Sequence, residues 1–304
     1  MASPTTGPSP IVRRGRRLWL WALGLGPIAG VAAASWWFTA PLRDSSPPTP
    51  TLPTVAPAPS AVVDPGWPEG VEEGEPAKCR LLAVLLRDRA LLSSHVGYTA
   101  TLRKQERMNG KLGPEQTIAM KVRNRPFGIY LKFLSPKLGK EVVYAEGHHD
   151  GKVIAHNGDW TRMLIPRLAV NPTDRLALAD TRHPVTEAGL FALVEKLIGF
   201  RELDLDQSAA VTILDRATID GKAWLRSLHL HSDSHAGRPF ARVEVLYDPE
   251  SRLPAQIRNY SFPEPGQTGE PLLAERYAYL DLKWADDLTD LDFDPSNPAY
   301  AFMR

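Results

Sequence analysis

The feature that most constrains this fold is a change in hydrophobic period near residue 98, where large apolar side chains begin to alternate with polar or small ones. Over residues 117–122 and 129–133, every second side chain is large and apolar. A period of two places alternate side chains on opposite faces of a β-strand. Asn109-Gly110 is typical of a type I′ hairpin turn, in which both central residues need positive φ. This region therefore predicts successive antiparallel strands with one apolar face.

Two helices are expected beside these strands. Residues 76–93 and a segment that opens at His183-Pro184 carry apolar residues at three- and four-residue spacing. Further alternating runs lie between residues 211 and 284, and the chain shows no βαβ rhythm. The predicted fold class is α+β and mainly antiparallel β. We expect an open curved sheet or half-barrel of about ten strands wrapped around two helices, preceded by one transmembrane helix.

The N-terminus predicts attachment to a membrane. Four arginines occur between residues 13 and 17, within a basic cytoplasmic tail of residues 1–17. Residues 18–38 carry no charge, and as a helix they would span about 30 Å, the thickness of a bilayer core. Tryptophans near both ends fit the two interfaces, and the arginines mark the cytoplasmic side. We expect an inner-membrane anchor with the C-terminal domain in the periplasm or otherwise outside the cytoplasm.

The same segment has a second interpretation as a cleaved signal sequence. Ala32-Ala33-Ala34-Ser35 provides the small residues that a signal peptidase accepts. Cleavage there would make the protein secreted. The apolar run is longer than an ordinary signal core and continues past these alanines, which favours the retained anchor.

The composition then divides the remainder of the chain. Ten of the 28 prolines fall in residues 39–78, which predicts an extended linker with too few apolar residues to form a core. Residues 79–304 are the only segment long enough for a sizeable core, and we assign them to one exported domain.

Several functional classes are excluded or disfavoured by composition and motifs. A net charge of +1 disfavours nucleic-acid binding, and the single cysteine, Cys79, excludes an internal disulfide. Nucleophile-elbow, zinc-protease and phosphate-loop motifs do not occur. Ser227, His229 and His231 share one face of a predicted strand, which we interpret as a solvated polar face. We expect no cofactor, no metal and no enzymatic activity.

The apolar alternation is the strongest positive signal for function. An ordinary filled core explains it, and so does a cavity for an apolar ligand on the concave face of the sheet. The candidate ligand-binding residues comprise the lining of the first strand set, its continuation in the second set, and residues at the mouth. They are Ile118, Met120, Ile129, Leu131, Phe133, Val142 and Tyr144; Val243, Val245 and Tyr247; and Trp160, Leu164, Ile165, Leu190 and Phe191.

Five stretches carry a resemblance to a known family. They are residues 98–107, residues 109–112, Tyr130-Leu131-Lys132-Phe133-Leu134-Ser135-Pro136, Gly139-Lys140-Glu141-Val142-Val143-Tyr144 and the tail of residues 291–300, and they resemble an uncharacterised bacterial family known mostly from planctomycetes. The resemblance covers residues 79–304. More distantly, the strand order is similar to that of the LolA-like lipoprotein carriers and the RseB-like envelope-stress regulators. That resemblance implies an open sheet with helices in its mouth and binding of acyl chains or an apolar peptide.

These observations lead to one expected function and two alternatives. We expect a non-enzymatic cell-envelope module that binds a lipid, an acylated molecule or another apolar ligand, in the manner of a lipoprotein carrier. The first alternative is an envelope protein-interaction or stress-sensor module with a protein partner. The second is an unrecognised hydrolase.

Overall fold

A computed structural model describes residues 64–158, 167–205, 207, 209–232, 238–263 and 269–303. The predicted membrane segment, residues 18–38, the basic tail before it and the linker up to residue 63 lie outside the described residues. Among the residues that are described, no helix is long and apolar enough to cross a membrane.

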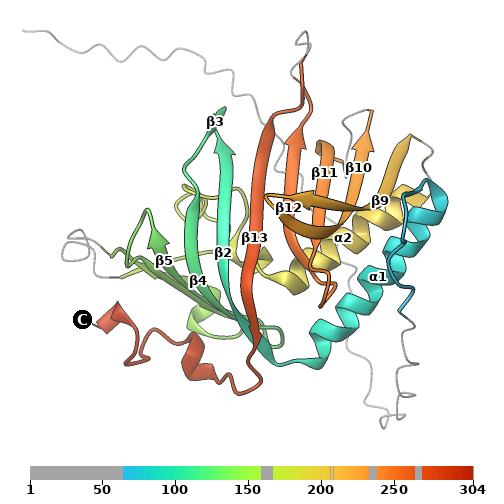
Figure 1. Cartoon of the computed structure of the whole chain (residues 1–304). Helices are drawn as coiled ribbons and strands as arrows, with labels where there is room; N and C mark the ends of the chain where they lie inside the picture. The colour runs from blue at the N-terminus through green and yellow to red at the C-terminus, as the bar shows by residue number, and fades with distance from the viewer. Residues whose placement is uncertain are drawn as a thin grey trace, which may run out of the picture. The chain divides into compact units, whose positions relative to one another are not determined.

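The described part of the chain forms one open antiparallel sheet of thirteen strands with two α-helices (Figure 1). The strands are β1 (Glu72–Glu73), β2 (Gly97–Met108), β3 (Lys111–Leu112), β4 (Gln116–Arg123), β5 (Gly128–Ser135), β6 (Glu141–Ala145), β7 (Val153–His156), β8 (Leu168–Val170), β9 (Ala210–Ile219), β10 (Lys222–His231), β11 (Phe240–Tyr247), β12 (Pro254–Ser261) and β13 (Leu273–Trp284). The open antiparallel sheet with two helices confirms the predicted mainly antiparallel α+β class, and the transmembrane helix of that prediction lies outside the described residues. The expected number of strands was too low because β1, β3 and β8 are only two or three residues long.

The strand order joins two meanders into one sheet. It runs β1-β9-β10-β11-β12-β13-β2-β4-β5-β6-β7-β8, and β3 pairs with β2 alone. The last strand, β13, therefore lies beside the first long strand, β2, although most of the domain separates them in sequence. Asn109 and Gly110 have φ of 50° and 77° in the turn between β2 and β3, as the hairpin signal predicts.

Helix α1 (Glu75–Ser94) forms where the leucine spacing predicts it. Its buried residues include Leu81, Val84, Leu85 and Leu92, which lie on one side because they recur at three- and four-residue spacing. Asp88 belongs to the same buried stripe and is 0% exposed. Helix α1 packs against α2 and β9.

Helix α2 (Leu190–Leu205) begins later than we expected from His183-Pro184. Those residues precede a short 3₁₀ turn, η3 (Val185–Glu187), and Gly189 has a φ of 99° that ends this irregular stretch. The Tyr98 hydroxyl accepts the backbone N–H of Leu190 at 2.7 Å. A tertiary contact from β2 therefore fixes where the helix starts.

The end of the predicted linker packs on the sheet. Trp67 is 8% exposed, and its indole N–H donates to the Asp215 carbonyl at 2.9 Å. Glu72 and Glu73 pair with β9. The folded domain therefore includes residues 64–78, which the composition groups with the linker.

The C-terminal segment covers one face of β5, β6 and β7. Phe293 lies at the end of η4 (Asp290–Phe293), and Phe302 lies in η5 (Ala301–Met303). The Tyr300 ring stacks on Tyr130, with 3.8 Å between ring centroids. The resulting cluster consists of Tyr130, Val143, Ala145, Ile154, Phe293, Tyr300 and Phe302. One face of these strands is thus covered by the tail, and the opposite face is left for other contacts.

Candidate functional site: an apolar face and the segment beside it

Four neighbouring strands place large apolar side chains on the same face of the sheet. Across β2, β4 and β5, Ile118 is opposite Leu102 and Phe133, and Met120 is opposite Leu131. In the next pair, Leu131 is opposite Val142, and Ile129 is opposite Tyr144. We call this surface the apolar face; it consists of Leu102, Ile118, Met120, Val122, Ile129, Leu131, Phe133, Val142 and Tyr144. The period-two pattern therefore brings the first seven predicted lining residues together.

The apolar face is buried to different depths. Ile118, Met120 and Ile129 are at most 2% exposed, and Phe133 and Val142 are at most 9% exposed. Leu131 and Tyr144 are only half-buried. Apart from the Tyr144 hydroxyl, these side chains offer dispersion contacts and no hydrogen bonds, so the face suits hydrocarbon.

Helices α1 and α2 lie mainly over the other half of the sheet. The first residue of α2, Leu190, is hydrogen-bonded to Tyr98 of β2. The other end of the helix reaches β10, where the Asp204 carboxylate lies 3.7 Å from His231 Nε2. Helix α1 contacts β9. Figure 1 shows both helices extending toward the β9 side. Gly189, the residue before α2, lies beside Val122 of the apolar face. The segment between β8 and α2 that ends at Gly189 borders this face.

That segment, residues 180–189, is fixed along its length by contacts with the strands. Asp180 forms ion pairs with Lys137 and Lys140 in the turn between β5 and β6. Thr181 accepts a hydrogen bond from Lys104 of β2 at 2.9 Å. Each successive contact lies further across the sheet, toward β13. The segment therefore runs across one end of the apolar face before it turns to the start of α2.

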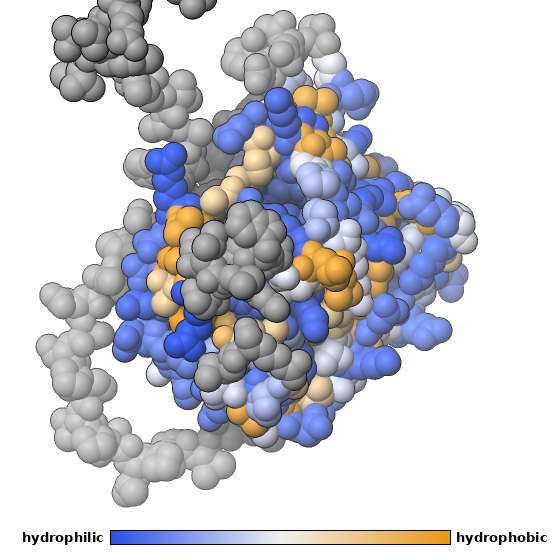
Figure 2. Space-filling view, turned by 90° about the vertical axis from the view of Figure 1, so that its left-hand side faces the viewer, coloured by the Kyte–Doolittle hydropathy of each residue, from blue (hydrophilic) through white to orange (hydrophobic). Residues whose placement is uncertain are grey.

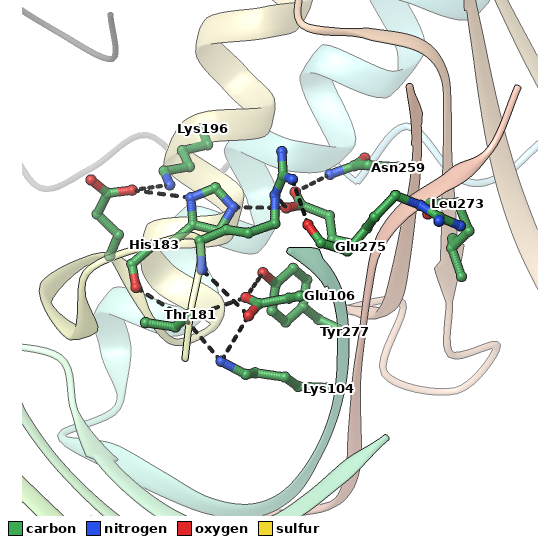
Figure 3. A network of polar contacts seen from close by, with 12 residues as sticks. Lys104, Glu106, Thr181, His183, Lys196, Asn259, Leu273, Glu275 and Tyr277 are labelled. Atoms are coloured by element: carbon green, nitrogen blue, oxygen red, sulfur yellow. Dashed lines mark hydrogen bonds and ion pairs between the residues drawn. The ribbon is translucent and has the colours of Figure 1, made fainter. Parts of the chain in front are cut away.

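Two buried glutamates hold this segment in place (Figure 3). Glu106 of β2 and Glu275 of β13 are direct cross-strand partners and are at most 6% exposed. Arg182 donates its backbone N–H to Glu106 at 3.3 Å and its Nε lies 2.8 Å from Glu275. His183 Nε2 lies 3.0 Å from the same Glu275 carboxylate. We call these four residues the carboxylate clamp.

The clamp has further polar partners that satisfy both carboxylates. Lys104 lies 3.1 Å from Glu106, and the Tyr277 hydroxyl donates to the same group. Asn259 donates to Glu275 at 2.7 Å. Burial alone would raise the pKa of Glu275, but the hydrogen bonds from His183 and Asn259 and the charge of Arg182 outweigh it and lower this pKa. Glu275 therefore stays ionised, and the two buried glutamates are tolerated on neighbouring strands because Lys104 lies beside Glu106 and Arg182 lies beside Glu275.

The remaining predicted residues lie elsewhere. Val243, Val245 and Tyr247 are buried in β11, and Tyr247 packs on Trp67 with ring centroids 5.0 Å apart. They belong to the core beneath the helices. Leu190 is buried at the start of α2, and Phe191 lies under the guanidinium of Arg125 at 5.1 Å. Trp160, Leu164 and Ile165 lie outside the described residues.

The sequence did not reveal a buried polar cluster beneath the helices. Ser227 and His229 are at most 1% exposed, so our interpretation of them as a solvated face is wrong. His229 contacts Ser227 and Thr212, both at 3.1 Å, and its burial lowers its pKa well below the ordinary value. Arg201 of α2 lies nearby and is 2% exposed. An alternating strand pattern cannot reveal such burial, because helices cover these polar positions.

Among the described residues, no three His, Cys, Asp or Glu side chains gather in a way that could hold a metal ion. Cys79 is exposed. The surface seen from the β5 side is mostly hydrophilic, with separate hydrophobic patches (Figure 2). Leu134 and Leu138, in and after β5, are 42% and 70% exposed.

Comparison with known proteins identifies one sequence family and several similar folds. The model of a family described as proteins of unknown function, DUF1571, matches residues 95–302. None of the curated proteins matches the chain significantly.

The similar solved structures include proteins of the lipoprotein-carrier type that the sequence resembles. The Mycobacterium tuberculosis lipoprotein LppX is 13% identical, with a TM-score of 0.39 over 73% of this chain and 100% of that chain. A putative outer membrane lipoprotein-sorting protein domain from Vibrio parahaemolyticus is 10% identical, with a TM-score of 0.33 over 70% and 95%. A LolA superfamily protein from Nitrosomonas europaea is 10% identical, with a TM-score of 0.29 over 70% and 96%. Similarity at this level carries no inference about what this chain binds.

Proposed function

The chain belongs to the DUF1571 family of proteins of unknown function, and we propose that its folded domain is a non-enzymatic binding module for an acyl chain or another apolar ligand. The observation that carries the proposal is the apolar face, which spans four strands beside the region that the two helices cover. Each buried CH₂ group contributes roughly 0.8 kcal/mol, so a long acyl chain gains substantial binding free energy without any ion pair.

The carboxylate clamp supports this proposal because it gives the site a fixed border. Residues 180–189 are bound to β2 and β13 by part-buried polar contacts and to the β5–β6 turn by an exposed ion pair. A border that is already ordered lowers the entropy cost of binding. The clamp glutamates accept hydrogen bonds from this segment, so we assign them a structural role and propose no catalysis.

The proposed place of action is the cell envelope. With residues 18–38 as a membrane anchor and residues 39–63 as an extended tether, the domain would stay near the outer side of the inner membrane. An anchored domain would take up or present its ligand at that membrane. The secreted form, with residues 18–38 removed, is the corresponding alternative.

Binding of a fluorescent polyene fatty acid to the purified chain of 304 residues tests this function. Leu131→Gln places a polar group on the apolar face, and we expect it to weaken binding about tenfold, the equivalent of 1.4 kcal/mol. Leu134→Gln is the matched control, because Leu134 lies on the same strand, is 42% exposed and has no partner on β4 at the register shift there.

The proposal fails if the chain does not bind the probe, or if both substitutions change binding equally. Reproducible capture of one envelope protein together with absent probe binding would favour the protein-interaction module instead. Thermal unfolding of each variant shows whether the fold is retained.

A further inference from the structure

A cationic cluster lies at one end of the apolar face. Lys137 and Lys140 belong to the turn between β5 and β6, and Lys104 belongs to β2. The Lys140 ammonium lies over the Phe133 ring, 5.2 Å from its centroid, and the Lys140 carbonyl accepts the Phe133 backbone N–H at 2.8 Å. The cluster is therefore in direct contact with a residue of the apolar face.

This cluster carries more positive charge than its neighbours neutralise. Asp180 pairs with Lys137 and lies 3.8 Å from Lys140, so a single carboxylate serves both ammonium groups. Lys104 is held by Glu106. Burial of Lys140, followed by the charges of Lys137 and Lys104, lowers the pKa of Lys140, while Asp180 opposes this effect. The position favours an additional negative charge.

The cluster is also accessible to a ligand. The side chain of Asp180 is 56% exposed, and those of Lys137 and Lys140 are 38% and 22% exposed. An exposed ion pair contributes little to stability, so an incoming anion can replace or join Asp180 at small cost. Charge-assisted hydrogen bonds from two ammonium groups then fix the anion at the edge of the site.

We propose that Lys137 and Lys140 form the head-group subsite of the apolar site, and that its ligand class is an acyl chain ending in an anionic group, a carboxylate or a phosphate. This inference rests on the proposed function and specifies its ligand. The chain of the ligand would lie on the apolar face with its head group beyond Phe133. Lys104 would add to the local positive potential without being a direct ligand.

The test compares two probes that differ only at the head group. Hexadecanoate and 1-hexadecanol each compete with the fluorescent fatty acid for binding to the whole chain. The protein is kept in a fluorinated surfactant that does not occupy hydrocarbon sites. We expect the double substitution Lys137→Gln and Lys140→Gln to weaken hexadecanoate binding about tenfold or more and to change hexadecanol binding less than twofold. Lys132→Gln is the matched control, because Lys132 lies on β5, points to the opposite face and is 46% exposed.

The possible outcomes separate this inference from the proposed function. If both probes bind with equal affinity and the double substitution affects neither, the head-group subsite is wrong and the apolar site stands. If neither probe binds, the proposed function itself is wrong. If inorganic phosphate alone binds in a way that needs Lys137 and Lys140 but does not compete with hexadecanoate, the cluster is a separate anion site and the inference is also wrong.

Discussion

At the scale of single residues, Asp88 shows how much a buried position can change an ordinary side chain. It lies in the buried stripe of α1, and burial raises its pKa to about 7, although Arg87 at 2.7 Å opposes this shift. The folded state therefore holds a proton that the unfolded state releases near pH 4. Stability linked to Asp88 is present below pH 4 and is progressively lost as the pH rises from 4 to 7.

Asp88→Asn should remove this loss, because the amide carries no charge to bury. Three pKa units correspond to roughly 4 kcal/mol as an upper bound. We expect the effect of the substitution on the free energy of unfolding to be about 1–2 kcal/mol more stabilising at pH 8 than at pH 4.5. Urea unfolding at both pH values measures this difference, and Glu195→Gln on α2, with a side chain that is 42% exposed, is the control. Equal effects of Asp88→Asn at both pH values would contradict the account.

Gly128 tests the contact between β5 and the C-terminal tail. A Cβ atom at this position would lie 2.8 Å from Cγ of Phe293, whose side chain is fully buried. Gly128→Ala should therefore displace the ring and lower the free energy of unfolding by about 1–3 kcal/mol. Gly199→Ala in α2 is a control that meets nothing within 4 Å and should be neutral or stabilise by up to about 1 kcal/mol. Similar results for the two variants would show that the tail does not pack as described.

At the scale of secondary-structure elements, the carboxylate clamp determines the path of residues 180–189. Glu275→Gln retains the shape of the side chain but removes the charge that faces Arg182 and His183. We expect amide hydrogen exchange in residues 180–189 to become at least tenfold faster while β4 and β5 remain protected. Glu250→Gln in an exposed turn is the control. Unchanged exchange in residues 180–189 would mean that other contacts hold this segment.

The elements also show which parts of the fold the sequence could predict. Strands β4 and β5 were predictable because one face of each is buried and apolar, and this alternation also identified the apolar face. Glu106 and Glu275 were not identified, because each is polar at a position where the pattern expects an apolar side chain. Arg182 is 76 residues from Glu106 in sequence, and His183 is 92 residues from Glu275. Only the pairing of β13 with β2 brings all four together.

The start of α2 illustrates the same limit. His183-Pro184 has the local chemistry of a helix N-terminus, yet the helix begins at Leu190 because Tyr98 supplies the acceptor there. Ser227 and His229 were placed on a solvated face because strand alternation gives the face of a side chain but not what covers it. Trp67 was grouped with the linker by its proline-rich neighbours, although its ring packs on Tyr247.

At the scale of the whole molecule, we expect residues 18–38 to be retained as an anchor. We expect the protein isolated from its own cell membranes to keep its N-terminus and to remain with the membrane after alkaline carbonate extraction. Intact mass measurement and fractionation check this expectation. A soluble chain that begins near residue 35 would show that the segment is a cleaved signal sequence and that the domain is not tethered.

We propose above that the domain carries an apolar ligand on the face formed by β2, β4, β5 and β6. The most direct measurement is native mass spectrometry of the whole chain purified from membranes, followed by organic extraction of any bound molecule. We expect a mass increment that matches one acyl-containing species in the extract, and we expect that increment to be lost in Leu131→Gln but not in Leu134→Gln. A mass equal to that of the chain alone, with no uptake of added hexadecanoate, would contradict this proposal.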